Sequence, residues 1–253
     1  MPYADVNGLH LYYEEQGEGP PLVLLHGGLM TIELNFGVAL PALAEHRRVI
    51  AVELQGHGRT ADVARSPTFP DFAADVVALL DHLGIERADV VGFSIGGLTG
   101  YELVISYPDR VRRAVVASAD HRNDRGGEAD PARLPTQDDF QAMRDTYVAM
   151  APDPGAFDAV AERTSGLVQS FTGWTDDQLR DVRLPVLILV GDTDFIHVEN
   201  AAELPPFRES EIKNPARGYR RIEKPRPCRA GLKVSRVTHR DLKIGDRADP
   251  VVK

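Results

Sequence analysis

The chain alternates short, largely apolar runs with longer stretches of helical spacing, and this alternation limits its fold more than any other feature. Three of these runs, Pro21 to Leu25, Arg48 to Leu54 and Ala88 to Val91, are followed by glycine-containing turns. Runs that are apolar throughout, rather than at every second position, are typical of strands covered on both faces of a parallel sheet. The spacing therefore predicts an α/β fold with a doubly wound, mostly parallel sheet.

Further elements are expected on both sides of these runs. Asn7-Gly8 is a turn signal and predicts a hairpin of strands 3–6 and 9–13. Helical spacing predicts helices over 38–45, 72–83 and 98–106, and apolar runs predict buried strands over 111–118 and 185–190. In the second of these helices, Asp71, Asp75 and Asp81 mark the expected polar face.

The stretch 119–184 contains no strand pattern but has helical spacing over 140–150, 157–171 and 176–182. A segment of this length cannot be a simple loop in a compact domain. We therefore expect a helical cap inserted over the ends of the sheet strands. The chain then divides into a first core part at 1–118, the cap at 119–184, a second core part at 185–204 and an atypical basic segment at 205–253.

Composition bounds the class of protein. A net charge of −9 argues against nucleic acid or an anionic membrane as a general partner. The single cysteine, Cys228, excludes an internal disulfide and a zinc cluster built on cysteines. No leader pattern is evident, and no run approaches the ~18 apolar residues of a membrane span. We expect a soluble cytoplasmic protein.

Charge is distributed unevenly along the chain. Residues 1–204 contain 15 arginines, no lysine and 32 acidic residues, for a net charge of −17. Residues 205–253 contain all five lysines and the cysteine, and their net charge is +8. Such an abrupt break is compatible with a domain boundary, with a basic tail, or with sequence from another source such as a shifted reading frame.

The segment Gly92-Phe93-Ser94-Ile95-Gly96 follows a predicted strand and precedes a predicted helix. This is the G-x-S-x-G pattern of a nucleophile elbow, in which a sharp turn lifts a serine hydroxyl above the end of a sheet. A serine also needs a base, an orienting acid and donors for the developing oxyanion. We expect Ser94 to be the nucleophile and the N–H groups of Gly28 and Ile95 to form the oxyanion hole. The alternative is a glycine-rich turn with an incidental serine.

Four motifs occur in order: His26-Gly27-Gly28, then Gln55-Gly56-His57-Gly58-Arg59-Thr60, then Gly92 to Gly97, then Gly191-Asp192-Thr193-Asp194. Together they resemble the α/β-hydrolase fold family, in particular its branch of small bacterial esterases and enol-lactonases. The resemblance covers roughly residues 1–204. It implies an enzyme that uses neither a metal nor a cofactor.

The resemblance also implies an acid after a strand in a Gly-x-x-Asp pattern, which assigns that role to Asp194. Asp192, two residues nearer the strand, is interpreted as a turn residue. Asp120 follows the strand expected over 111–118, where some members of the family have their acid instead. It remains an alternative.

The base is the least constrained member of the site. His26 and His57 belong to glycine turns, where a structural role is expected. Five other histidines do not fit the order Ser, Asp, His or have no route to the site: His10, His46, His82, His121 and His197. His239 remains, and it follows a possible strand over 232–237. Its distance of 45 residues from Asp194 is longer than the family pattern, and five prolines interrupt the segment between them.

The resemblance thus implies a serine hydrolase of small carboxylic esters or lactones that works through an acyl-enzyme. Ser94, His239 and Asp194 would form the triad, and the partner would be a small molecule. A cofactor-free haloperoxidase or perhydrolase is a second interpretation. A third is a catalytically impaired binding protein. Candidate substrate walls are Phe140, Met143, Phe157, Phe171 and Trp174, although aromatic and methionine residues at helical spacing are more often ordinary core residues.

Overall fold

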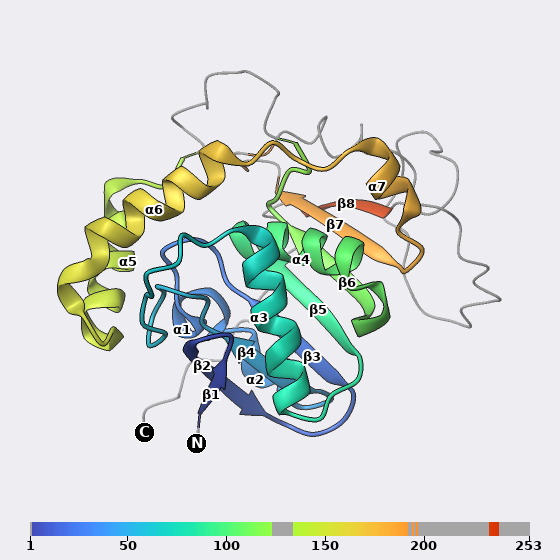
Figure 1. Cartoon of the computed structure of the whole chain (residues 1–253), viewed down its shortest axis with the longest axis horizontal. Helices are drawn as coiled ribbons and strands as arrows, with labels where there is room; N and C mark the ends of the chain where they lie inside the picture. The colour runs from blue at the N-terminus through green and yellow to red at the C-terminus, as the bar shows by residue number, and fades with distance from the viewer. Residues whose placement is uncertain (1, 123–133, 192–193, 195, 197–232, 238–253) are drawn as a thin grey trace, which may run out of the picture.

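The computed structural model describes residues 2–122, 134–191, 194, 196 and, for the backbone only, 233–237. Eight strands form one sheet in the order β1-β2-β4-β3-β5-β6-β7-β8 (Figure 1). The strands are β1 (Tyr3–Val6), β2 (Leu9–Gln16), β3 (Pro21–Leu25), β4 (Arg48–Val52), β5 (Ala88–Phe93), β6 (Val111–Ala117), β7 (Val186–Gly191) and β8 (Lys233–Val237).

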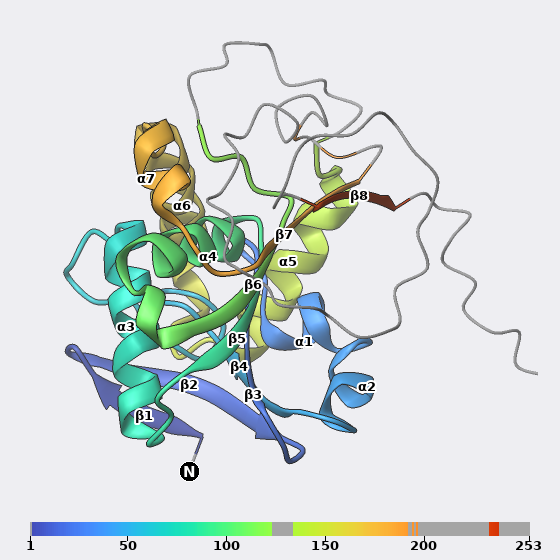
Figure 2. The same ribbon diagram turned by 90° about the vertical axis from the view of Figure 1, so that its right-hand side faces the viewer.

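The sheet is mostly parallel, as the apolar runs predict. Only β1 and β2 pair antiparallel, β1 with β2 and β2 with β4, whereas all pairs from β4 to β8 are parallel. Helices α3 (Phe69–His82) and α4 (Ile95–Ser106) cover one face, and α1 (Ile32–Phe36) and α2 (Leu40–Ala44) cover the other (Figure 2). The doubly wound α/β fold is confirmed.

Two layers of apolar side chains hold the helices to the sheet. The larger layer includes Leu25, Val52, Phe72, Leu79 and Tyr101, all at most 1% exposed. The smaller layer joins α1 and α2 to the opposite face of β3 and β4. Continuous burial on both faces is what the uninterrupted apolar runs of these strands require.

Two expectations about the helices were wrong. The helix expected over 38–45 is only α2, and the chain forms the separate short helix α1 before it, while Val38 between them is 94% exposed. Asp75 does not lie on the polar face of α3. It is buried because Arg65 and Asn7 donate hydrogen bonds to its carboxylate.

Between β6 and β7 the chain forms α5 (Gln137–Met150), α6 (Phe157–Ser170) and α7 (Asp176–Asp181). Helices α5 and α6 arch over one end of the molecule (Figure 1). Tyr147, Phe157 and Val160 form a small core together with Leu29 from the loop after β3. Of the candidate substrate walls, Phe157 and Trp174 are buried, whereas Phe140 is exposed.

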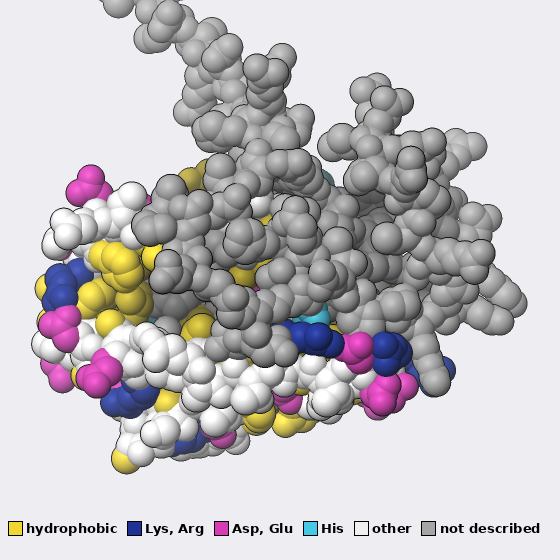
Figure 3. Space-filling view, turned by 90° about the horizontal axis from the view of Figure 1, so that it is seen from above, with side chains coloured by type: hydrophobic (Ala, Val, Ile, Leu, Met, Phe, Trp, Pro, Cys, Tyr) yellow, Lys and Arg dark blue, Asp and Glu magenta, His cyan; other side chains and the backbone are white. Residues whose placement is uncertain are grey.

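The face seen from above carries hydrophobic side chains at the end that holds α5 and α6 (Figure 3). Two exposed apolar residues of that region, Phe140 and Val148, lie on α5. Among the described residues, no helix is both long enough and apolar enough to cross a membrane.

Candidate active site

The candidate site residues follow the carboxyl ends of neighbouring parallel strands. Ser94 follows β5, Ser118 follows β6 and Asp194 comes three residues after the end of β7. Backbone hydrogen bonds extend the sheet ladder to this edge, since Ser94 N donates to Ala117 O at 2.9 Å and Ser118 N donates to Leu189 O at 2.9 Å. Open α/β sheets bind ligands at this edge.

Ser94 occupies a strained turn between β5 and α4. Its φ of 52° and ψ of −117° are unusual for a residue with a side chain, and the serine hydroxyl caps no helix N–H. A Cβ on Gly92 would lie 2.1 Å from Gly96 O, and one on Gly96 would lie 2.1 Å from Leu25 O. The two glycines of the motif are therefore required by close backbone packing, and they place Ser94 at the tip of the turn.

Gly28 and Ile95 lie next to each other, as the motifs predict. A Cβ built on Gly28 would be 3.6 Å from Cγ2 of Ile95. Ile95 is the first residue of α4, where the helix itself supplies no acceptor for its N–H. Within the described part of the chain, no acceptor is found for the Gly28 N–H either. Two backbone donors are thus available beside Ser94.

Asp194 is fixed by several hydrogen bonds. Its carboxylate accepts from Ser118 Oγ at 2.5 Å, from Gly191 N at 3.3 Å and from Ile196 N at 3.1 Å. Ser118 has a φ of 51°, which is a second strained serine at this edge of the sheet. Sequence reasoning did not single out Ser118, although its position as the last residue of the run 111–118 was a usable signal.

His26 and His57 are structural, as their glycine turns indicate. His26 Nε2 accepts a hydrogen bond from Leu54 N at 3.0 Å, and its Nδ1 lies 2.7 Å from Gly27 O. Burial, together with the nearby His57, lowers the pKa of His26 to about 3, so its ring is neutral. Burial also lowers the pKa of His57, whose Nδ1 lies 3.0 Å from Gln55 O.

Glu53 joins the loop after β4 to the start of α1, and sequence reasoning missed it. Its carboxylate accepts from Arg59 N at 2.5 Å and from Ile32 N at 3.4 Å, and it pairs with the Arg59 guanidinium at 2.9 Å. Burial raises the pKa of Glu53 to about 7 despite these donors. A Cβ on Gly58 would lie 2.3 Å from this carboxylate, so the glycine turn closes around it.

Asp120 and His121 follow β6 on the far side of Ser118. His121 Nδ1 lies 3.0 Å from Asp120 Oδ1, but the geometry makes no hydrogen bond, and neither ring nitrogen of His121 has a hydrogen-bond partner among the described residues. Within the same part of the chain, the buried Tyr101 hydroxyl likewise has no hydrogen-bond partner. Burial, followed by the charge of Asp120, raises the pKa of Tyr101.

The predicted base, His239, lies outside the described residues, as do Asp192 and His197. The strand expected over 232–237 is present as β8, and it pairs in parallel with β7 so that Val237 is opposite Gly191. Strand β8 therefore ends at the same edge of the sheet as β7, the edge that carries Asp194. Its last residue, Val237, is two positions before His239.

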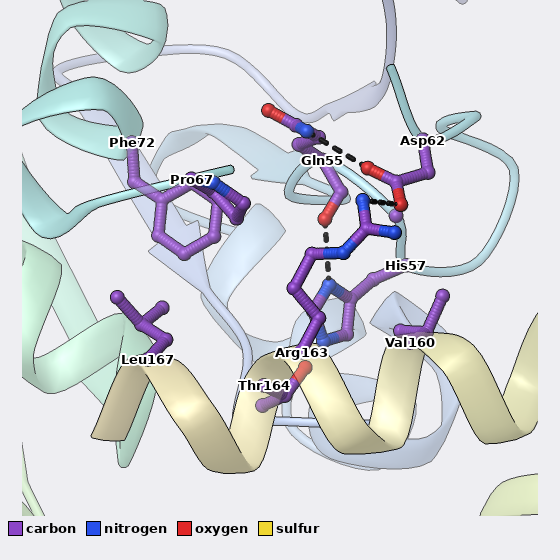
Figure 4. A pocket seen from close by; sticks show the side chains of 10 residues that line it. Gln55, His57, Asp62, Pro67, Phe72, Val160, Arg163, Thr164 and Leu167 are labelled. Atoms are coloured by element: carbon purple, nitrogen blue, oxygen red, sulfur yellow. Dashed lines mark hydrogen bonds and ion pairs between the residues drawn. The ribbon is translucent and has the colours of Figure 1, made fainter. Parts of the chain in front are cut away.

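A small cavity lies between the loop after β4 and helix α6 (Figure 4). Its volume of about 10 Å³ is room for about one water molecule. Arg163 of α6 forms an ion pair with Asp62, which also accepts from Gln55 Nε2 at 2.8 Å. Thr164 Cγ2 would be 2.9 Å from a Cβ on Gly28, so α6 packs directly on the loop that carries this glycine.

No metal site is built from the described residues, because none of them form a group of three or more His, Cys, Asp or Glu placed to hold an ion. The carboxyl edge of the described sheet carries a serine hydroxyl, a carboxylate held by hydrogen bonds and two backbone N–H groups.

The chain is similar in sequence and in fold to several known proteins. The non-heme haloperoxidase of Rhodococcus erythropolis is 28% identical over 237 residues, which cover 80% of this chain and 86% of that protein. The 2-hydroxymuconate semialdehyde hydrolase of Pseudomonas sp. (strain CF600) is 38% identical over 112 residues, which cover 43% of this chain and 40% of that protein. The enol-lactonase of Burkholderia xenovorans LB400 has a similar structure, with a TM-score of 0.61 and 24% identity, over 76% of this chain and 81% of that one.

The extent of these matches differs between relatives. The chain spans only 46% and 32% of the length of two other curated relatives. The sequence model of the alpha/beta hydrolase fold matches residues 20–170, which is more than half of the chain and includes the loop with Gly28 and the turn with Ser94. The chain therefore belongs to the alpha/beta hydrolase fold family.

Proposed function

We propose that the protein is a serine hydrolase of small carboxylic esters or lactones. The observation that carries the proposal is the backbone of Ser94, which adopts a strained positive φ at the turn between β5 and α4. Strain of this kind persists only where the surrounding structure fixes it, and it is concentrated at functional sites. Ser94 directly precedes Ile95, and neither the Ile95 N–H nor the Gly28 N–H has an acceptor among the described residues.

In the proposed reaction, Ser94 Oγ forms a bond to the substrate carbonyl carbon while its proton passes to the His239 imidazole. The N–H groups of Gly28 and Ile95 stabilise the resulting oxyanion. The intermediate collapses with cleavage of the bond to the alcohol oxygen, which takes the proton from His239. A water molecule then gives its proton to His239 and attacks the acyl group, and Ser94 is released with its proton restored.

Asp194 orients His239 in this mechanism. Hydrogen bonds from Ser118, Gly191 and Ile196 fix its carboxylate at the end of β7. The parallel pairing of β8 with β7 supports the choice of His239 as the base, because β8 ends opposite Gly191 just before this histidine.

The first test is covalent labelling of the folded protein with a fluorophosphonate probe, with Ser94→Ala as the control. We expect one label per chain and none on the variant. Hydrolysis of short p-nitrophenyl esters and of a simple lactone should fall at least about a thousandfold in Ser94→Ala. An unlabelled, folded wild-type protein would contradict the proposal and favour a binding protein that has kept the fold.

The base is tested separately with His239→Ala and, as a matched control, His82→Ala at the exposed end of α3. Loss of ester hydrolysis in His239→Ala alone supports the triad. If both variants retain activity, a different group takes the proton. Sequencing the coding DNA beyond codon 204 then shows whether another reading frame supplies a histidine.

A second candidate, peracid formation or halogenation, is favoured by the similarity to the haloperoxidase over 80% of the chain. It uses the same Ser94, so Ser94→Ala removes both activities. Incubation with hydrogen peroxide and a short carboxylic acid distinguishes the two, because only a perhydrolase makes peracid faster than it hydrolyses the corresponding ester.

A further inference from the structure

A second concave region lies at the amino-terminal edge of the sheet, opposite the edge that carries Ser94. It has a volume of about 410 Å³ and is lined by Pro20, Arg47, Asp89, Arg112 and Arg113. These residues come from the starts of four neighbouring strands, β3, β4, β5 and β6. We call this set of residues the arginine pocket.

Three guanidinium groups converge on one carboxylate in this pocket. Asp89, whose side chain is 7% exposed, lies 2.7 Å from Arg47 Nη1, 3.1 Å from Arg112 Nε and 2.9 Å from Arg113 Nε. Burial acts to raise the pKa of Asp89, but hydrogen bonds from Arg113 and Arg47 outweigh it and lower the pKa. The single negative charge of Asp89 therefore faces the positive charges of three guanidinium groups, so the pocket has a net charge of +2.

A local irregularity of the sheet produces this convergence. Ala88 pairs with Val111 and Asp89 pairs with Arg113, so Arg112 is an extra residue on β6. In a regular strand, Arg112 and Arg113 would point to opposite faces, whereas here both reach the same carboxylate. Bulges of this kind redirect side chains and occur often beside functional sites.

The arginines keep unused donors. Besides Asp89, Arg112 Nη2 donates to Pro21 O at 2.9 Å, and no other acceptor within the described ranges bonds to the three guanidinium groups. Arg113 is 55% exposed and Arg112 is 37% exposed at the side chain. This concentration of positive charge stands in the part of the chain where acidic residues outnumber arginines by 32 to 15.

We propose that the arginine pocket binds a phosphate dianion, either as inorganic phosphate or as the phosphate group of a small phosphate monoester. A dianion matches the two excess positive charges. The paired N–H donors of guanidinium groups fit the oxygens of a phosphate group, and such charge-assisted bonds are among the strongest in proteins. This site is separate from the proposed reaction at Ser94 and does not depend on it.

The test is calorimetric titration of the full chain at constant ionic strength in a chloride buffer, with inorganic phosphate in one arm and glycerol 3-phosphate in the other. Arg113→Ala removes one donor group but leaves Asp89 paired with Arg47 and Arg112, so the fold should survive. The matched control, Arg180→Ala, removes a similarly exposed arginine on α7. Asp89→Asn removes the central negative charge.

We expect one binding site per chain, about tenfold weaker binding in Arg113→Ala, and no change in Arg180→Ala. Folded Asp89→Asn should bind more tightly, because a repulsive charge is gone. Equal binding of both anions assigns the site to the phosphate group itself, whereas preference for glycerol 3-phosphate assigns it to a monoester. No saturable binding in either arm, or equal loss in Arg113→Ala and Arg180→Ala, would overturn the proposal.

Discussion

Ser94 and Ser118 share a feature that is rare for residues with side chains, a φ near +50° at the end of a parallel strand. At Ser94 this conformation presents the hydroxyl at the tip of a turn. At Ser118 it directs the hydroxyl to the carboxylate of Asp194. The same backbone conformation thus occurs at Ser94, the proposed nucleophile, and at Ser118, whose hydroxyl donates to the proposed acid Asp194.

Replacing Ser118 tests its role as a positioning residue. In Ser118→Ala we expect kcat for ester hydrolysis to fall about tenfold to a hundredfold with little change in KM, because Asp194 loses a fixed orientation. The low-pH limb of the kcat/KM profile should also move to lower pH, since His239 is less well stabilised in its charged form.

Ser118→Gly is the control, because glycine adopts the positive φ without strain but has no hydroxyl. If the hydroxyl matters, both variants lose activity alike. Full activity in Ser118→Gly with loss in Ser118→Ala would show that only the backbone conformation is required.

Glu53 predicts a specific pH dependence of stability. Its pKa rises from 4.5 in the unfolded chain to about 7 in the folded one, so the folded state binds more protons between these values. The contribution of this group is therefore fully present below pH 4.5 and is lost as the pH rises through 7. The loss amounts to about 3 kcal/mol at most.

Urea unfolding of wild type and Glu53→Gln at a series of pH values measures this contribution. We expect the free energy of unfolding of wild type, relative to the variant, to decrease between pH 5 and pH 7.5. A constant difference across that range would show that Glu53 has an ordinary pKa.

Sequence motifs predicted some of these residues and not others. Ser94 and Ile95 lie in one motif and Gly28 in another, and the proximity of the two motifs could be predicted because a nucleophile elbow of this kind combines with a glycine turn after an earlier strand to form an oxyanion hole. Glu53 and Ser118 act through partners that are distant in sequence or on another strand, such as Asp194, which is 76 positions from Ser118. Periodicity carries no information about such pairs.

At the scale of elements, helix α4 packs against the sheet through its backbone. A Cβ on Gly96 would lie 2.1 Å from Leu25 O, whereas one on Gly100, one turn later in the same helix, would meet only Val116 Cγ2 at 3.6 Å. The first turn of α4 is thus pressed against β3, and the second has room for a methyl group.

These two glycines form a matched pair for thermal or urea unfolding. Gly96→Ala should lower the free energy of unfolding by about 2 kcal/mol or more, because backbone atoms must move apart. Gly100→Ala should raise it by about 0.5–1 kcal/mol, because alanine favours the helix. Equal effects of the two substitutions would be inconsistent with the close packing of α4 on β3.

Strands were easier to predict than helices for a physical reason. Buried parallel strands need continuous apolar runs, and β3 and β6 match the ranges expected from those runs to within one residue. Helix α1 has only five residues and depends on its N-cap residue, Thr31, whose Oγ1 accepts a hydrogen bond from Leu34 N at 3.3 Å. So short a helix has no periodicity to detect.

At the scale of the whole molecule, two of the polar contacts that the structure describes join the helices between β6 and β7, the proposed cap, to the core. Arg163 of α6 pairs with Asp62 in the loop after β4, and Trp174 Nε1 donates to Glu102 Oε2 of α4 at 2.9 Å. The first contact is half-exposed and the second is buried. We therefore expect the end near α6 to open first.

Hydrogen exchange of the α6 amides tests this order. Arg163→Ala should increase exchange of Phe157–Ser170 by up to about fivefold, since a partly exposed ion pair contributes about 1 kcal/mol at most. The control, Arg144→Ala, removes a pair with Asp158 that lies within the cap and should leave this opening unchanged. The same exchange in both variants would mean that Asp62 does not hold the cap.

Leu29 lies in the loop of Gly28 and packs against the helices of the proposed cap. This contact limits which caps from related hydrolases could replace the one in this chain. Leu29 follows Gly28 with a φ of 61° and belongs to the small core with Tyr147, Phe157 and Val160. A cap taken from another hydrolase would need an apolar pocket of matching shape to bury this leucine. Without such a pocket, Leu29 would shift and move the N–H group of Gly28 beside Ser94. A cap exchange intended only to change substrate specificity would then also change the rate of ester hydrolysis.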